Sequence, residues 1–93
     1  MEHARGAFDC ARTALDRGEY DTAENLAAAI SKRFPYSKFG VLSEELLADV
    51  LAARHEYADA AESYELFIRF HPTHERLPEI RRKLAEVQTQ LAQ

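Results

Sequence analysis

The residues best suited to chemistry lie in the segment from His71 to His74, which holds two of the four histidines. Imidazole nitrogens bind zinc, and Cys10 or His3 would supply the further ligands that a metal requires. Pro72 interrupts a helix, however, so the two histidines do not share one helical face, and no third ligand stands at a defined spacing. We interpret the segment as a turn that contains histidines, and we expect neither a metal nor a cofactor.

Acid–base and nucleophilic catalysis have no better support. Glu44 and Glu45 are adjacent, so in a helix their side chains point about 100° apart. No serine or cysteine has a base at a spacing typical of a nucleophilic enzyme. The single cysteine, Cys10, has three small helical neighbours, Ala7, Ala11 and Ala14. This setting predicts a small buried apolar contact rather than a reactive thiol, and the sequence predicts a protein that is not an enzyme.

Charged side chains form one basic cluster, made by Arg76, Arg81, Arg82 and Lys83. Glu79 precedes Lys83 by four residues, a spacing that favours an ion pair on one helix and predicts a solvated face. A contact for an acidic partner is the alternative. The net charge of −4 argues against a nucleic-acid partner, which requires an excess of clustered cations.

Length and composition describe one small domain over residues 1–93, with 46% hydrophobic residues. No apolar run approaches the roughly 20 residues that a membrane span needs. The first residues lack the basic and apolar regions of a secretory signal, so we expect the chain to stay where it is made. The compartment itself is not defined by these features.

Apolar residues at steps of three and four predict five helices and no strand. The expected ranges are about 3–17, 20–34, 38–54, 57–71 and 77–92. Gly18 suits the end of the first helix, and Ser37 suits the N-cap of the third. The third helix is apolar on two sides and should lie in the middle, whereas the fifth has a narrow apolar stripe typical of an end.

An internal repeat defines the fold class. A shift of 37 residues places Tyr57 on Tyr20 and Pro72 on Pro35, and it also pairs Arg54 with Arg17, Glu56 with Glu19, Ala48 with Ala11 and Ala60 with Ala23. We therefore predict an all-α solenoid of antiparallel helix pairs. It has a first repeat over about 3–35, a second over about 37–72 and a capping helix over about 77–92.

The order within each unit resembles the tetratricopeptide repeat, whose usual period is about 34 residues. Gly18-Glu19-Tyr20 with Ala23 and Pro35 matches its turn and second helix, and Glu56-Tyr57 with Ala60, Tyr64 and Pro72 matches again. His55 stands where the turn glycine is expected. The resemblance predicts close helix crossings at two small pairs, Ala11 with Ala23 and Ala48 with Ala60.

The longer period narrows the resemblance, together with the segments Arg33-Phe34-Pro35-Tyr36-Ser37 and Phe67 to His74. Residues 7–77 resemble the amino-terminal repeats of the BamD/ComL/YfiO outer-membrane assembly lipoproteins and, less closely, the YbgF/CpoB proteins. This resemblance implies a periplasmic location at the inner face of the outer membrane. It also implies a ligand, an unfolded segment of an outer-membrane β-barrel protein.

In tetratricopeptide folds the first helix of each repeat lines a peptide-binding groove. The matching positions here are Arg5, Phe8, Arg12, Leu42, Glu45, Asp49, Glu79, Arg82 and Glu86. The resemblance thus implies a protein- or peptide-binding module, and ordinary packing is the alternative role for Phe8. The other candidate function is a structural module that joins copies of itself, with a homodimer as the simplest form. For this we single out Leu66 and Phe70, which lie off the main stripe of their helix, where a following repeat would cover them.

Overall fold

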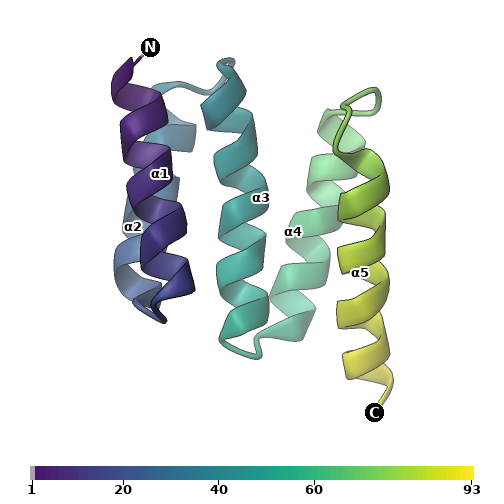
Figure 1. Ribbon diagram of the computed structural model, residues 1–93. Coiled ribbons are helices and arrows are strands. Elements are labelled where there is room, and N and C mark those ends of the chain that lie inside the picture. The colour runs from purple at the N-terminus through teal and green to yellow at the C-terminus, as the bar shows by residue number, and fades with distance from the viewer. Residues whose placement is uncertain (1) are drawn as a thin grey trace.

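The computed structural model describes residues 2–93, with side chains from Ala4 onward, so His3 lies outside the described side chains. Its helices are α1 (Glu2–Asp16), α2 (Tyr20–Arg33), α3 (Lys38–Ala53), α4 (Tyr57–Phe70) and α5 (Leu77–Ala92) (Figure 1). Each predicted boundary lies within one residue of the observed one, and residues 2–93 contain no strand. None of these helices has the length and apolar character needed to cross a membrane.

The helices form two layers, with α1, α3 and α5 in one and α2 and α4 in the other (Figure 1). The molecule measures 41 × 30 × 17 Å, and its thinnest dimension corresponds to two helix diameters. α3 lies in the middle and packs on α1, α2 and α4, as its two apolar sides predict. The all-α solenoid of antiparallel helix pairs is therefore confirmed.

The turns within the two repeats share one backbone geometry. Gly18 has φ +77°, and its equivalent His55 has φ +67°. In each turn the following amide reaches back to the end of the helix, with Glu19 N donating to Ala14 O at 2.8 Å and Glu56 N donating to Leu51 O at 2.9 Å. Glycine adopts this left-handed conformation without strain, whereas a histidine there is uncommon. The turn is therefore conserved in shape between the repeats although its residue has changed.

Small side chains let α1 and α2 approach closely. Ala11 clusters with Ala27, and Ala14 clusters with Ala23, all of them buried. Ala11 and Ala23, one of the two pairs expected at a close crossing, are both buried but belong to different clusters about one turn apart. The other expected pair, Ala48 with Ala60, lies in one cluster. The expected burial of Cys10 is wrong, since its side chain is exposed. Cys10 precedes the buried Ala11 and so points about 100° away from it.

The second repeat has a larger core. Tyr64 occupies the position of Ala27 in the first repeat, and it is 2% exposed. As predicted, its ring lies between α3 and α4, and its hydroxyl donates to Asp49 Oδ1 on α3 at 2.5 Å. Phe67, Ile80 and Val87 belong to the same buried cluster, which joins α4 to α5. The fifth helix is thus held by its apolar stripe.

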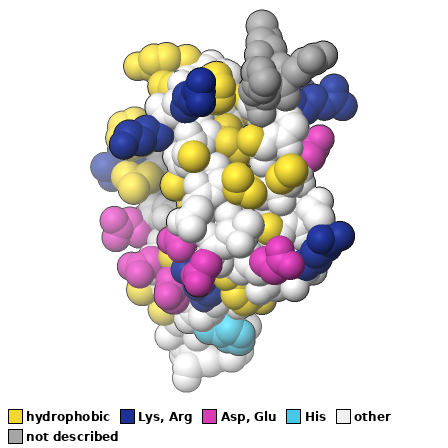
Figure 2. All heavy atoms as spheres, turned by 90° about the vertical axis from the view of Figure 1, so that its left-hand side faces the viewer, with side chains coloured by type: hydrophobic (Ala, Val, Ile, Leu, Met, Phe, Trp, Pro, Cys, Tyr) yellow, Lys and Arg dark blue, Asp and Glu magenta, His cyan; other side chains and the backbone are white. Residues whose placement is uncertain are grey.

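At both ends of the stack, polar residues occupy positions whose equivalents on the middle helix, α3, are apolar. Asp9 and Thr13 on α1 are exposed, whereas their equivalents on α3, Leu46 and Val50, are buried. Figure 2 shows the face formed by α1 and α2, where hydrophobic side chains lie across the upper and middle part and charged groups lie mostly at the edges and in the lower part. On α5 the outward positions include the exposed Gln88 and Thr89. A polar outer surface is what terminal units of a solenoid require.

Leu66 and Phe70 remain exposed on the outer side of α4, at 39% and 66%. Their equivalents in the first repeat, Ala29 and Arg33, are also exposed although the second repeat packs beside them. Cover of Leu66 and Phe70 by a following repeat therefore has no counterpart between the first and second repeats. Stacking of repeats leaves this surface free, so the apolar character of these two residues needs another explanation.

Candidate functional site

The layer of α1, α3 and α5 carries all the residues predicted for the groove. Four of them, Arg12, Asp49, Arg82 and Glu86, line one open hollow of about 250 Å³. The complete lining of this hollow is Arg12, Leu15, Asp49, Ala52, Tyr64, Arg82, Lys83, Glu86 and Val87. We call it the central hollow. Residues from three successive helical units thus meet at one place, as the repeat register predicts.

A second hollow of about 420 Å³ adjoins the central hollow toward the carboxyl ends of α3 and α5. The two share Ala52, Glu86 and Val87, and the second adds Tyr57, Thr89 and Gln90. The space lies between α3 and α5, which do not pack as directly as α1 and α3 do. The layer of α1, α3 and α5 is therefore most open along this junction.

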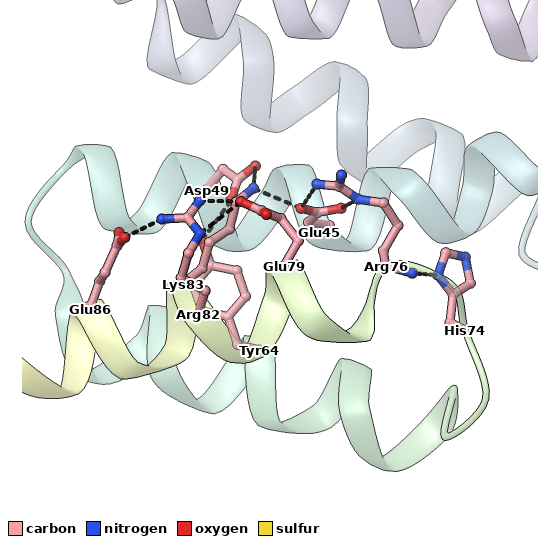
Figure 3. A network of polar contacts seen from close by, with 9 residues as sticks. All are labelled: Glu45, Asp49, Tyr64, His74, Arg76, Glu79, Arg82, Lys83 and Glu86. Carbon is pink, nitrogen blue, oxygen red and sulfur yellow. Dashed lines mark hydrogen bonds and ion pairs between the residues drawn. The ribbon is translucent and has the colours of Figure 1, made fainter.

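Long charged side chains bridge α3 and α5 (Figure 3). Glu45, whose side chain is 5% exposed, accepts hydrogen bonds from Arg76 at 2.6 Å and from Lys83 Nζ at 2.7 Å. Lys83 also donates to both carboxylate oxygens of Asp49 at 3.1 Å. Asp49 accepts the Tyr64 hydroxyl as well. Every buried charge of this network therefore has an opposite charge beside it, as burial demands.

Two expectations for the basic cluster are corrected by this network. Lys83 does not pair with Glu79 but crosses to α3, because its position on α5 is equivalent to that of the buried Leu46 and faces inward. Glu79 and Glu86 instead bind Arg82 along the surface of α5. The cluster is therefore not a uniformly solvated face. Arg81 and Arg82 are exposed, whereas Lys83 is largely buried.

The network sets the ionisation of its acids in opposite directions. Burial by itself raises the pKa of Glu45, but hydrogen bonds and charges from Arg76 and Lys83 outweigh it and hold the pKa below the usual 4.5. For Asp49 burial prevails over Lys83 and Tyr64, and the pKa lies above the usual 3.8. Burial and the neighbouring Asp49 also raise the pKa of Tyr64, which stays a neutral donor. The two directions agree with the contacts, because Glu45 has two cations beside it, Arg76 and Lys83, whereas Asp49 has only Lys83 among the described side chains.

Glu45→Gln is expected to reduce the loss of stability at acid pH. The lowered pKa of Glu45 contributes stability that is fully present above pH 4.5 and is lost as the pH falls through the lower folded value. The raised pKa of Asp49 acts in the opposite sense, because its contribution is present below 3.8 and is lost as the pH rises through the folded value.

Urea unfolding from about pH 6 to about pH 3 checks this expectation by comparing the slopes of stability against pH. Glu62→Gln is the matched control, since Glu62 is an exposed acid on α4. An acid limb that is equally steep in Glu45→Gln and the unsubstituted protein would contradict the assigned role of Glu45.

The remaining groove positions differ in how far their side chains are exposed and packed. Phe8 is half-buried, contacts Phe39 with ring centroids 5.6 Å apart and packs on the cluster of Ala11 and Leu46. Leu42 is half-buried but lies outside the hydrophobic clusters formed by the described residues. Arg5 and Arg12 are exposed. Phe8 therefore has a packing role, whereas Leu42 and the two arginines are available to a ligand.

The histidines of the α4–α5 connection make contacts within the protein. His71 Nε2 lies 3.2 Å from Glu44 Oε1, and His74 Nδ1 accepts the backbone N–H of Arg76 at 3.0 Å. Both rings contact Phe67, at centroid distances of 4.7 and 5.3 Å. Among the described residues, no three ligand-type side chains come together as a metal would require. The segment positions Arg76, which sequence reasoning treated only as part of a surface cluster.

The family is shown by comparison of sequences. A profile of the tetratricopeptide repeat matches residues 3–89, which is nearly the whole chain. No curated protein matches the chain in sequence. The profile agrees with the helix pairs and the shared turn geometry described above. The chain therefore belongs to the tetratricopeptide repeat family, whose repeats are typically non-catalytic modules of protein–protein interaction.

Proposed function

We propose that this chain is a binding module that holds an extended segment of a partner protein on the face of α1, α3 and α5. The observation that carries this proposal is the central hollow, where Arg12, Asp49 and Arg82 from three successive units line one open space. Repeated helices that present equivalent positions at regular intervals form extended binding surfaces. A peptide in an extended conformation matches such a surface because its own side chains also recur at regular intervals.

The chemistry of the face supports a partly apolar ligand. Leu42 and Ala52 lie on the same side of α3 as Asp49, at steps of seven and three residues from it. Ala52 and Val87 line both hollows. An extended peptide with alternating apolar side chains can place one of them there and leave the next in water.

We further propose that the natural ligand is an unfolded segment of an outer-membrane β-barrel protein, and that the chain works in the periplasm. The support is the resemblance carried by the 37-residue period and by the segments at Arg33–Ser37 and Phe67–His74. Strands of such barrels alternate apolar and polar residues. The ligand class is therefore of the kind that the face of α1, α3 and α5 accommodates.

Photo-crosslinking tests both levels of this proposal. A photoreactive amino acid replaces Leu42 on the binding face or, as the matched control, Leu66 on the outer side of α4. The probe is an outer-membrane β-barrel protein unfolded in urea and diluted into buffer, and a urea-unfolded water-soluble protein serves as the second probe. We expect crosslinks from position 42 to the barrel protein, few from position 66, and fewer from either to the soluble protein.

Different failures have different meanings. Equal crosslinking of both unfolded proteins from position 42 would overturn the β-barrel ligand and leave the peptide-binding face intact. Crosslinking from position 66 alone, or from neither position, would overturn the binding face itself.

Self-association is the second candidate function, and one observation favours it. Leu66 and Phe70 are exposed at positions where the repeat stack leaves their equivalents uncovered. A two-fold contact would bury both residues from each copy. Sedimentation at micromolar concentration should then show a dimer that Leu66→Glu dissociates. A monomer that Leu66→Glu leaves unchanged would exclude this function.

A further inference from the structure

We propose that the partner segment carries an acidic residue beside an apolar one, with the apolar side chain in the central hollow against Ala52 and Val87 and the carboxylate on Arg12. This inference rests on the binding function proposed above and specifies the chemistry of the ligand.

The preference for an apolar ligand side chain follows from a difference between the two repeats. Leu15 on α1 and Ala52 on α3 are equivalent under the 37-residue shift. Leu15 packs on the clusters that contain Leu46 and Val50 of α3, and so it covers the junction of α1 with α3. At the junction of α3 with α5 the smaller Ala52 leaves the corresponding space open, and both hollows reach it. A ligand side chain of about the size of leucine fits where the protein has omitted its own.

The lining of this space is suited to an apolar group. Ala52, Val87 and Leu15 are the aliphatic side chains among its lining residues. Burying an apolar side chain of leucine size here would remove it from water without displacing any charge pair, because Lys83 and Asp49 already satisfy each other.

The preference for an acidic ligand side chain follows from the charges around the central hollow. Lys83 is bound to Glu45 and Asp49, and Arg82 is bound to Glu79 and Glu86. Among the described side chains, Arg12 is the cation that lines this hollow without an ion pair. A carboxylate on the ligand can therefore pair with Arg12 without breaking an existing ion pair.

A cationic ligand has no comparable site. The acids that line the hollow are Asp49 and Glu86, and both already bind cations of α5. A lysine or arginine from the ligand would have to replace Lys83 or Arg82, which are held by two acids each. Since the overall charge is −4, long-range attraction would favour cations, so preference for an acid would come from contact with Arg12.

The test is a selection of short linear peptides from a random phage-displayed library on the full chain, followed by affinity measurements with the synthetic winners. We expect enriched peptides to share an acidic residue beside leucine, isoleucine, valine or phenylalanine. Ala52→Leu, which copies the first repeat, should fill the hollow and weaken binding about tenfold or more. Arg12→Glu should weaken it by about tenfold. Arg17→Glu is the matched control, because Arg17 is an exposed arginine directly after α1 that lies outside the central hollow.

The outcomes separate the two levels of the argument. One outcome is selected peptides that are basic or uncharged and bind less tightly to Ala52→Leu but equally well to Arg12→Glu. This result would overturn the proposed acidic residue of the ligand and leave the binding face in place. Acidic winners weakened equally by Arg12→Glu and Arg17→Glu show general charge attraction and also overturn the assignment to Arg12. Winners weakened by Arg12→Glu but unaffected by Ala52→Leu overturn the apolar site at Ala52 and leave the binding face in place. Winners unaffected by both substitutions, or no enrichment at all, overturn the binding face and this inference together. Circular dichroism and thermal unfolding of each variant confirm that the fold is retained.

Discussion

Tyr64→Ala is expected to lower the free energy of unfolding by about 3–5 kcal/mol. Tyr64 is 2% exposed and is the largest side chain among the fully buried residues. It belongs to the cluster that joins α4 to α5, and its hydroxyl reaches Asp49 on α3. Truncation would leave a cavity at the meeting point of three helices and a buried Asp49 with one partner fewer. Chemical denaturation followed by circular dichroism measures the change.

Tyr64→Phe separates the two contributions. It retains the ring and removes only the hydrogen bond to Asp49 at 2.5 Å, so the expected loss is about 1.5–3 kcal/mol for a bond to a charged group. A loss below about 1 kcal/mol for Tyr64→Ala would show that the ring does not fill the space between α3, α4 and α5.

Gly40→Ala is expected to destabilise the chain by about 3 kcal/mol through overpacking of backbone against side chain. Gly40 lies in the first turn of α3 and is buried. A Cβ atom there would overlap the carbonyl oxygen of Phe34 and lie 2.7 Å from its carbonyl carbon. That carbonyl also accepts the backbone N–H and the hydroxyl of Ser37, so it cannot move without breaking the turn between α2 and α3.

The same substitution at Gly6 is the matched control. Gly6 is an exposed residue of α1, and a Cβ atom there has no neighbour within 4 Å. Gly6→Ala should therefore stabilise the chain by about 1 kcal/mol, as alanine does inside a helix. Thermal unfolding of the two variants should shift in opposite directions. Equal small shifts would contradict the close approach of α3 to the end of α2.

The fold was predictable because its signals are local and repeated. Apolar steps of three and four define each helix, and the 37-residue shift defines how the helices pair. The Ser37 N-cap is confirmed, since its Oγ accepts the Gly40 N–H at 2.9 Å. Turn residues and caps act on their immediate neighbours, so their effect can be derived without coordinates.

The candidate site was predictable as a face but not as a set of partners. Helical spacing places Glu45 and Asp49 on one side of α3, yet it does not show that Lys83 from α5 and Arg76 from the α4–α5 connection reach them. Ion pairs across helices depend on interhelical distance, which Tyr64 influences by filling the space where the first repeat has Ala27. The role of Gly40 was missed for a related reason, because a close approach of backbones has no periodic signal. The open junction between α3 and α5 has one signal in the sequence. The 37-residue shift pairs Leu15 with the smaller Ala52.

An NMR titration of the amide resonances with a short peptide of alternating leucine and glutamate tests the central claim most directly. Binding on the face of α1, α3 and α5 predicts the largest shift changes around Arg12, Ala52 and Val87, which line the central hollow. The amides of Leu66 and Phe70, on the outer side of α4, should stay unchanged. Largest changes at Leu66 and Phe70, or no changes at millimolar peptide, would contradict the assignment of this face as the binding surface.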